Sequence, residues 1–321
     1  MKKELQAIIK YLQSVTTDPF PRYIFKKEIL QEAPTAADIE AIHASKWYKQ
    51  LADEQWDDGS WGRFHTQDSK APIKQKFVVT EMALRRIREL GISKDDSMVL
   101  KCVKLLERYV HGEETWSDWV EKHKDNGKSH MLWRPYVSAA QLNMFDPGNP
   151  VIQPLRNKLA AALKITSKYN FSFENILKQG TDEYIIAGIA APALYSALLL
   201  QNSRCMSDEL EKQYLEFLWN KVDGIYYVSS VPPAEKQHIE SKLFLQWFST
   251  LELLSGFSLF PDFMKGDIFP HLISEVNRIM NTDVEMPPAH PIFGHYAESW
   301  RDKSARKNDM ILRILRILIK S

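Results

Sequence analysis

Residues 76–110 read KFVVTEMALRRIRELGISKDDSMVLKCVKLLERYV, and the spacing of their apolar residues gives the clearest indication of the fold class. Apolar residues recur at spacings of three and four on both sides of the short loop GISKDD, for example Val99, Val103 and Leu106. That period is typical of an amphipathic helix, and Gly91 follows the first segment as a C-terminal glycine does. The stretch therefore predicts two helices joined by a short connection.

The same plan returns three times along the chain. Residues 130–163, 183–218 and 238–280 each read as helix, short loop and helix, with the loops FDPGNP, NSRCMSD and GFSLFPD. The first helices begin about 50 to 55 residues apart, at the upper end of known helical-repeat periods. Repeated pairs of this length predict an all-α fold, either a solenoid or an α/α toroid of inner and outer helices forming a full or partial barrel.

Length and composition narrow the classes of protein. With 42 Lys+Arg against 41 Asp+Glu and a net charge of +1, the chain has no long-range field to capture nucleic acid. It has 12 glycines, none spaced as GxGxxG or GxxxxGK[ST], which disfavours nucleotide-binding folds. We expect one domain over 1–321, with 1–35 as an N-terminal helical extension and 301–321 as a basic C-terminal capping helix.

The first residues, MKKELQAIIKYLQ, carry charges throughout, so we expect a cytoplasmic protein without a targeting segment. Residues 184–200, YIIAGIAAPALYSALLL, form one uncharged run that approaches the lower limit for a membrane span. Pro192 within it, and Asp182 and Glu183 before it, favour instead an inner helix walled by other helices. We therefore expect no transmembrane segment.

Residues 55–61 read QWDDGSW and contain the one family-specific motif. The heptapeptide resembles the QxxDGSW repeat of the terpenoid cyclase and protein prenyltransferase group, whose domains are α/α toroids. In such a motif the glutamine amide stacks on an indole and donates to a helix end, and Asp-Gly makes a tight turn. We therefore expect Gln55, Asp58, Gly59 and Trp61 to hold helices together rather than to react.

The resemblance does not extend to the catalytic motifs of that group. The chain has no DxDD motif, and the pairs Asp57-Asp58 and Asp95-Asp96 do not continue as DDxxD. Cys102 lies in the apolar pattern VLKCVKLLE, which indicates a core residue rather than a zinc ligand. No zinc or magnesium motif is recognised, so the cofactor is unknown, and the resemblance implies a fold without an activity.

The candidate catalytic and binding residues lie in the segments that precede the first helix of each pair. We expect these segments to converge, because the N-termini of inner helices in a toroid share one rim. His65 and Asp68 could act as a base and its orienting carboxylate, or as surface and capping residues. Asp182 could be a rim carboxylate or the N-cap of the apolar helix. The densest patch, residues 111–136, mixes titratable groups with Trp116, Trp119 and Trp133. Its candidates are Glu114, Asp118, His130, Arg134 and Tyr136, and the alternative is a solvated loop.

These observations lead to one principal hypothesis and two alternatives. We expect an enzyme, or a derived relative of one, that binds an isoprenoid or similar apolar substrate in a central cavity. A cytoplasmic lyase or glycosidase acting on carbohydrate, and a non-catalytic scaffold or interaction protein, remain open because a fold does not determine a function. The last helix, with Arg313, Arg316 and Lys320 on one stripe, more often caps a helical array than contacts a membrane.

Overall fold

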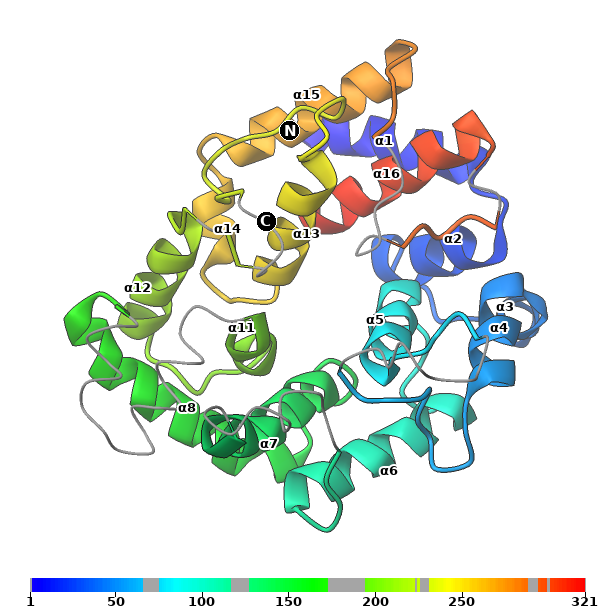
Figure 1. Cartoon of the computed structure of the whole chain (residues 1–321). Helices are drawn as coiled ribbons and strands as arrows, with labels where there is room; N and C mark the ends of the chain where they lie inside the picture. The colour runs from blue at the N-terminus through cyan, green and yellow to red at the C-terminus, as the bar shows by residue number, and fades with distance from the viewer. Residues whose placement is uncertain are drawn as a thin grey trace. The chain divides into compact units, whose positions relative to one another are not determined.

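The computed structural model describes residues 2–65, 75–116, 127–172, 194–222, 224–225, 231–287, 294–298 and 301–320. Within these ranges the chain forms helices and no strand, and the β-pairing there is a single parallel bridge between Arg63 and Val79. The prediction of an all-α fold is confirmed for this part of the chain (Figure 1). None of the described helices is long and apolar enough to cross a membrane.

The chain divides into two compact units. Unit 1 combines Met1–Gln50 with Pro233–Ser321, and unit 2 is the continuous segment Leu51–Pro232. Two compact units are compatible with one domain or with two, so the single domain over 1–321 stays a prediction.

Unit 1 is built from both ends of the chain. Its helices are α1 (Lys2–Val15), α2 (Pro19–Ile24), the π-helix η1 (Phe25–Ile29), α3 (Ala36–Ala44), α13 (Phe244–Leu254), α14 (Phe260–Met264), α15 (Ile268–Asn281) and α16 (Lys303–Leu318). Helix α16 packs against α15, α1 and η1, so that the N-terminal and C-terminal segments lie side by side (Figure 1). Within the expected N-terminal extension 1–35, helices cover Lys2–Val15 and residues 19–29, and α1 and η1 contact α16.

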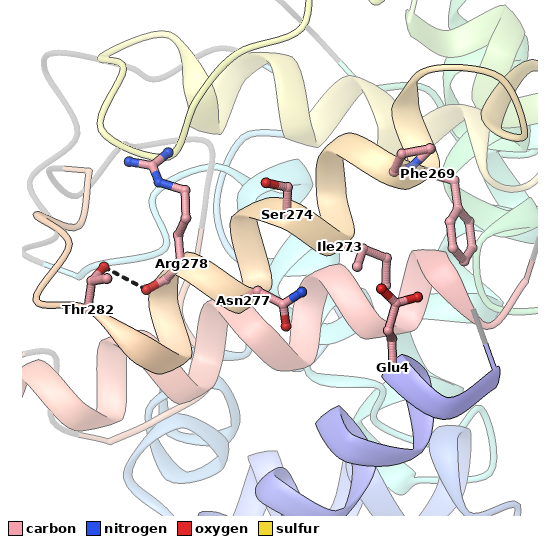
Figure 2. Close-up of a pocket in the computed structure, with 8 residues that line it drawn as sticks. Glu4, Phe269, Ile273, Ser274, Asn277, Arg278 and Thr282 are labelled. Atoms are coloured by element: carbon pink, nitrogen blue, oxygen red, sulfur yellow. Dashed lines mark hydrogen bonds between the residues drawn. The ribbon is translucent and has the colours of Figure 1, made fainter.

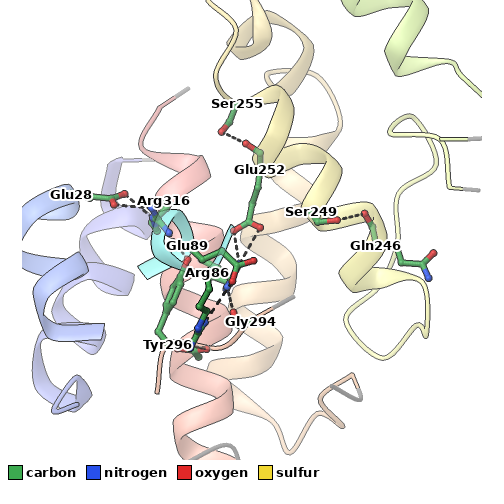
Figure 3. Close-up of polar contacts among 12 residues, drawn as sticks. Glu28, Arg86, Glu89, Gln246, Ser249, Glu252, Ser255, Gly294, Tyr296 and Arg316 are labelled. Carbon is green, nitrogen blue, oxygen red and sulfur yellow. Dashed lines mark hydrogen bonds and ion pairs between the residues drawn. The ribbon is translucent and has the colours of Figure 1, made fainter. Parts of the chain in front are cut away.

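The basic stripe of α16 is used inside unit 1. Arg313 is 1% exposed, and its guanidinium pairs with Glu252 of α13 at 2.9 Å and lies 4.3 Å above the ring of Tyr296. Arg316 forms two hydrogen bonds of 2.7 Å to the carboxylate of Glu28 (Figure 3). These contacts hold α16 within unit 1, and its role as the cap of a helical array stays a prediction.

Unit 2 contains the first three of the four predicted helix pairs, and the fourth, 238–280, corresponds to α13 and α15 of unit 1. Residues 183–193 of the third pair lie outside the described residues. Its helices are α5 (Thr80–Leu90), α6 (Ser97–His111), α7 (Gly127–Asn143), the 3-10 turns η3 (Pro150–Ile152) and η4 (Ser167–Tyr169), α8 (Gln153–Thr166), α11 (Leu194–Leu200) and α12 (Asp208–Trp219). Helix α7 packs against both α6 and α11. The loop 91–96 ends one helix and begins the next, as expected. Gly91, with a φ of +67°, is the C-cap of α5, and Asp96 is the N-cap of α6, because its side chain accepts a hydrogen bond from the Met98 amide.

Two segments differ from the pattern in the sequence. The periodicity over 36–52 predicts one helix, but the structure has α3 and α4 (Lys46–Glu54), which are separated at Ser45. The Ser45 hydroxyl donates to the Ile42 carbonyl at 2.6 Å, and its backbone is extended, with a ψ of 154°. A short polar side chain that bonds to its own backbone competes with the helix in this way. Residues 238–243 form turns rather than the start of α13.

Candidate functional site

The heptapeptide 55–61 connects three backbone segments of unit 2. The Gln55 side-chain amide donates to the carbonyl of Gly59 at 3.2 Å and to that of Met98, in the first turn of α6, at 2.9 Å. The Trp61 indole is fully buried and donates to the Leu51 carbonyl at 2.7 Å. Both side chains therefore satisfy carbonyl groups while they fix the turn against α4 and α6.

The turn itself depends on Asp58 and Gly59. Asp58 Oδ1 accepts hydrogen bonds from the amide and the hydroxyl of Ser60, at 2.8 and 2.7 Å. Gly59 has a φ of +95°, and a Cβ there would lie 2.7 Å from the carbonyl oxygen of Lys101. A residue with a side chain would meet both backbone strain and a steric clash at this position.

The segment that follows the turn is attached to the N-terminus of α5. The Trp61 amide donates to the Thr80 hydroxyl at 2.9 Å, and the amides of Thr80 and Glu81 donate to the carbonyls of Arg63 and Phe64 at 2.7 and 3.1 Å. These three bonds hold residues 61–64 beside the first turn of α5. The motif thereby places His65 next to Glu81.

His65 lies at the centre of a polar cluster. Its Nδ1 is 2.8 Å from Glu81 Oε2 and 3.0 Å from the Tyr195 hydroxyl of α11. The other oxygen of Glu81 accepts a hydrogen bond of 2.7 Å from the buried amide of Gln141 on α7. Residues of α5, α7 and α11 thus meet around one imidazole.

The carboxylate of Glu81 selects the tautomer of His65. An ionised carboxylate only accepts hydrogen bonds, so beside such a carboxylate the hydrogen of the neutral ring would lie on Nδ1, where the Tyr195 oxygen can accept it as well, and the lone pair on Nε2. Glu81 also lies in the first turn of α5, where the helix dipole favours negative charge. A histidine oriented in this way can take up a proton at Nε2 and return it.

Aromatic rings surround this polar group. Trp116 stacks on Phe64 with 4.5 Å between ring centroids and lies 6.3 Å from His65. The centroid of the Tyr195 ring lies 5.8 Å from that of His65 and 6.2 Å from that of Trp133. Together these residues form what we call the His65 cluster: Phe64, His65, Glu81, Trp116, Trp133, Arg134, Tyr136, Gln141 and Tyr195.

Two predicted site residues join the cluster through α7. The Arg134 guanidinium lies 5.3 Å from the ring of Trp116 and donates to the Thr115 hydroxyl at 3.1 Å. Tyr136 stacks on Trp133 at 5.6 Å, and burial raises its pKa to about 12. The structure thus places His65 and Arg134 at the ring of Trp116, and Tyr136 at the ring of Trp133.

The other predicted residues lie elsewhere or outside the described ranges. Glu114 is exposed and pairs with Arg108 at 2.6 Å. The backbone of His130 lies in α7. Asp68, Asp118 and Asp182 fall outside the described residues. Cys102 is fully buried, burial raises the pKa of its thiol to about 12, and Sγ donates to the Val99 carbonyl, as expected of a core cysteine.

A separate concave feature occurs in unit 1. A pocket of about 560 Å³ lies between α1 and α15 (Figure 2). It is lined by Glu4, Phe269, Pro270, Ile273, Ser274, Asn277, Arg278 and Thr282. Its ionisable lining groups are one carboxylate and one guanidinium, so it lacks the acid–base grouping that the His65 cluster has.

Comparison of the chain with models of protein families, with curated proteins and with solved structures found no match. The resemblance to terpenoid cyclases accordingly rests on the heptapeptide and on the helix pairs. Any activity has to be argued from the His65 cluster itself.

Proposed function

We propose that the chain is an enzyme, or a derived relative of one, that binds an isoprenoid or similarly apolar substrate against the His65 cluster. The observation that carries this proposal is the hydrogen-bonded set of Tyr195, His65 and Glu81 within a group of aromatic rings. Aromatic faces suit an apolar chain, and they stabilise positive charge that develops on it.

In the proposed reaction His65 is the group that transfers a proton. Glu81 orients the imidazole and stabilises the imidazolium that forms, and Gln141 fixes Glu81 in turn through its other oxygen. The terpenoid cyclases with a DxDD motif use an aspartic acid to protonate an alkene. His65 beside Glu81 is instead arranged as a base, which takes up a proton at Nε2 from a C–H bond as the electrons of that bond form a C=C bond. A His65–Glu81 pair would therefore make this chain a distinct member of the architecture.

We propose that the helix pairs form an α/α toroid, as a full or partial barrel. The first helices of three successive pairs, α5, α7 and α11, all contribute side chains to the His65 cluster. Inner helices of a toroid would converge in this manner. An experimental structure in which these helices are not neighbours on one inner ring would contradict the proposal.

A second candidate function is the cleavage of an acidic polysaccharide. The combination of a tyrosine hydroxyl, a histidine and an arginine near aromatic rings favours it, because His65 or Tyr195 could transfer a proton to or from the sugar while Arg134 binds a carboxylate. A non-catalytic scaffold is the third possibility, and it requires neither group to contact a small molecule.

Ligand soaks separate these functions. We expect crystals soaked with geranylgeranyl diphosphate to show density against Trp116 and Trp133, and crystals soaked with oligouronides to show none. The reverse result favours the polysaccharide, and density in neither soak, together with no effect of H65A in any binding assay, favours the scaffold.

Matched variants test the residue roles. H65A and E81Q should each lower turnover of the ligand found by soaking by about 100-fold or more, the usual range for loss of a general acid–base group. The control is H111A, because His111 is an exposed histidine at the end of α6. If H65A and H111A have equal activity, the proposed role of His65 is wrong.

We also propose that the protein works in the cytoplasm. Both cysteines, the buried Cys102 and the partly exposed Cys205, are free thiols. Thiols that remain reduced fit a reducing compartment. Fractionation of cells that express the full chain tests this placement.

A further inference from the structure

A group of three potential metal ligands lies in unit 1, apart from the His65 cluster. His271 and Glu275 are one turn apart on α15, and such i,i+4 pairs share a face of the helix. His238 comes from the turns that precede α13. One ring nitrogen of each histidine and one carboxylate oxygen of Glu275 lie within 4.8 Å of one another.

Neighbouring groups hold these side chains in place. His238 Nδ1 is 2.8 Å from Glu275 Oε1, and the Ile239 amide donates to Oε2 at 2.9 Å. His271 Nε2 is 2.8 Å from the carbonyl oxygen of Gln237, and its ring packs edge-on against Trp247 at 5.7 Å. The Ile239 amide and the Gln237 carbonyl, which are not themselves proposed ligands, are the kind of outer partner that orients the ligands of metal sites.

The local charge favours a cation. Arg278 contacts both oxygens of Glu275, at 2.9 and 3.0 Å, and also pairs with Glu240. Two carboxylates thus accompany one guanidinium, which leaves one unit of negative charge beside two imidazoles. Glu275 is buried, whereas the side chain of His238 is 70% exposed, so the group is anchored at one end and open to solvent at the other.

We propose that His238, His271 and Glu275 bind a divalent transition metal ion, with Zn²⁺ the best match. Two imidazoles and one carboxylate, with water in the fourth position, form a common tetrahedral zinc site. Zinc–ligand bonds of about 2.0–2.1 Å place tetrahedral ligand atoms about 3.3 Å apart. All the ligand atoms lie within 4.8 Å of one another, so no pair has to close by more than about 1.5 Å when the ion binds.

Metal titration of the full chain tests the proposal. We expect the chelator-treated protein at pH 7.5 to bind one Zn²⁺ in calorimetry, and Zn²⁺ to raise its melting temperature. Bound Co²⁺ should give the intense visible absorption of a tetrahedral site. The variants H238A and H271A should each weaken Zn²⁺ binding at least about tenfold, the lower end of the loss seen when even an outer partner of a ligand is removed.

The design includes a control for ordinary histidine binding. H111A removes an exposed histidine from unit 2 and should leave affinity and stoichiometry unchanged. Because H238A removes an exposed side chain, it is expected to fold, and circular dichroism verifies this. Absence of stoichiometric Zn²⁺ binding, or equal affinity in the wild type, H238A and H271A, overturns the proposal.

Discussion

At the scale of single residues, Gly59 is the position where the heptapeptide is most constrained. Its φ of +95° and its approach to the Lys101 carbonyl act together, whereas a Cβ at Gly112, where φ is +75°, would have no neighbour within 4 Å. We expect G59A to lower the free energy of unfolding by about 2–3 kcal/mol and G112A by about 1 kcal/mol. Denaturant unfolding of both variants measures the difference, and equal losses would show that the contact with Lys101 carries no cost.

The two tryptophans of the heptapeptide differ in their surroundings. Trp61 is fully buried and bonded to Leu51, while Trp56 is 40% exposed. We expect W61A to lower the free energy of unfolding by about 3–5 kcal/mol, as loss of a buried aromatic side chain does, and W56A by less than about 1 kcal/mol. Thermal melts compare the two. An unchanged melting temperature in W61A, combined with lost ligand binding, would instead assign Trp61 to a binding site.

At the scale of elements, the start of α3 provides a test by pH. Thr35 and Asp38 form a capping box, and Asp38 also accepts bonds of 2.9 and 3.0 Å from Lys26 Nζ. The Lys26 bond, followed by those from Thr35, lowers the pKa of Asp38 from 3.8 to about 2. Because the folded-state pKa is the lower one, this contribution to stability is present above about pH 4 and is lost as the pH falls towards 2.

The variant D38N tests this dependence. At pH 6 we expect it to lower the free energy of unfolding by about 1–2 kcal/mol, the usual range for a helix cap with a partly exposed ion pair. Near pH 2.5 the difference from the wild type should shrink, because Asp38 is then mostly protonated in the unfolded wild-type chain and folding has to release that proton. A difference that stays constant between pH 6 and pH 2.5 would mean that the charge of Asp38 contributes nothing.

The helices were more predictable from the sequence than the site. The spacing of apolar residues and the residues that stop and start helices predicted α5 and α6 to within a few residues. Gly91 marks the end of α5 and Asp96 the start of α6, and both signals are local in the sequence. The break between α3 and α4 at Ser45 was not predicted. A serine can occupy a position inside a helix, and here the break goes with a hydrogen bond from its hydroxyl to the Ile42 carbonyl, which the sequence does not reveal.

Within the His65 cluster, the sequence indicated His65, Arg134 and Tyr136 but not Glu81 or Tyr195. Glu81 has the appearance of an ordinary acidic residue in a first helical turn, and Tyr195 lies within an apolar run. Their contacts with His65 span 16 and 130 positions of the chain. Periodicity is a local property, so it contains no information on contacts at such separations.

At the scale of the whole molecule, unit 1 depends on segments from both ends of the chain. The Tyr11 hydroxyl donates to Asn308 Oδ1 at 3.0 Å, and Arg316 pairs with Glu28 at 2.7 Å. Deletion of residues 1–29 removes these partners and uncovers apolar side chains of α16. We expect hydrogen exchange to show lost protection in α13, α15 and α16, while α6 and α7 of unit 2 remain protected.

The α6 and α7 peptides serve as an internal control in that experiment. If they lose protection together with α16, the two units unfold as one, which would favour a single domain over 1–321. If every helix of unit 1 keeps its protection, the contacts of α1 and η1 with α16 are dispensable for that unit.

Because unit 1 consists of two separate segments of the chain, its two parts become available for folding at different times during translation. Leu51–Pro232 is continuous and can fold while the rest of the chain is being translated. Residues 1–50 are translated before unit 2, whereas α16, which packs against α1, is translated after it. The α1 helix therefore lacks its α16 partner until residues 303–318 have been made.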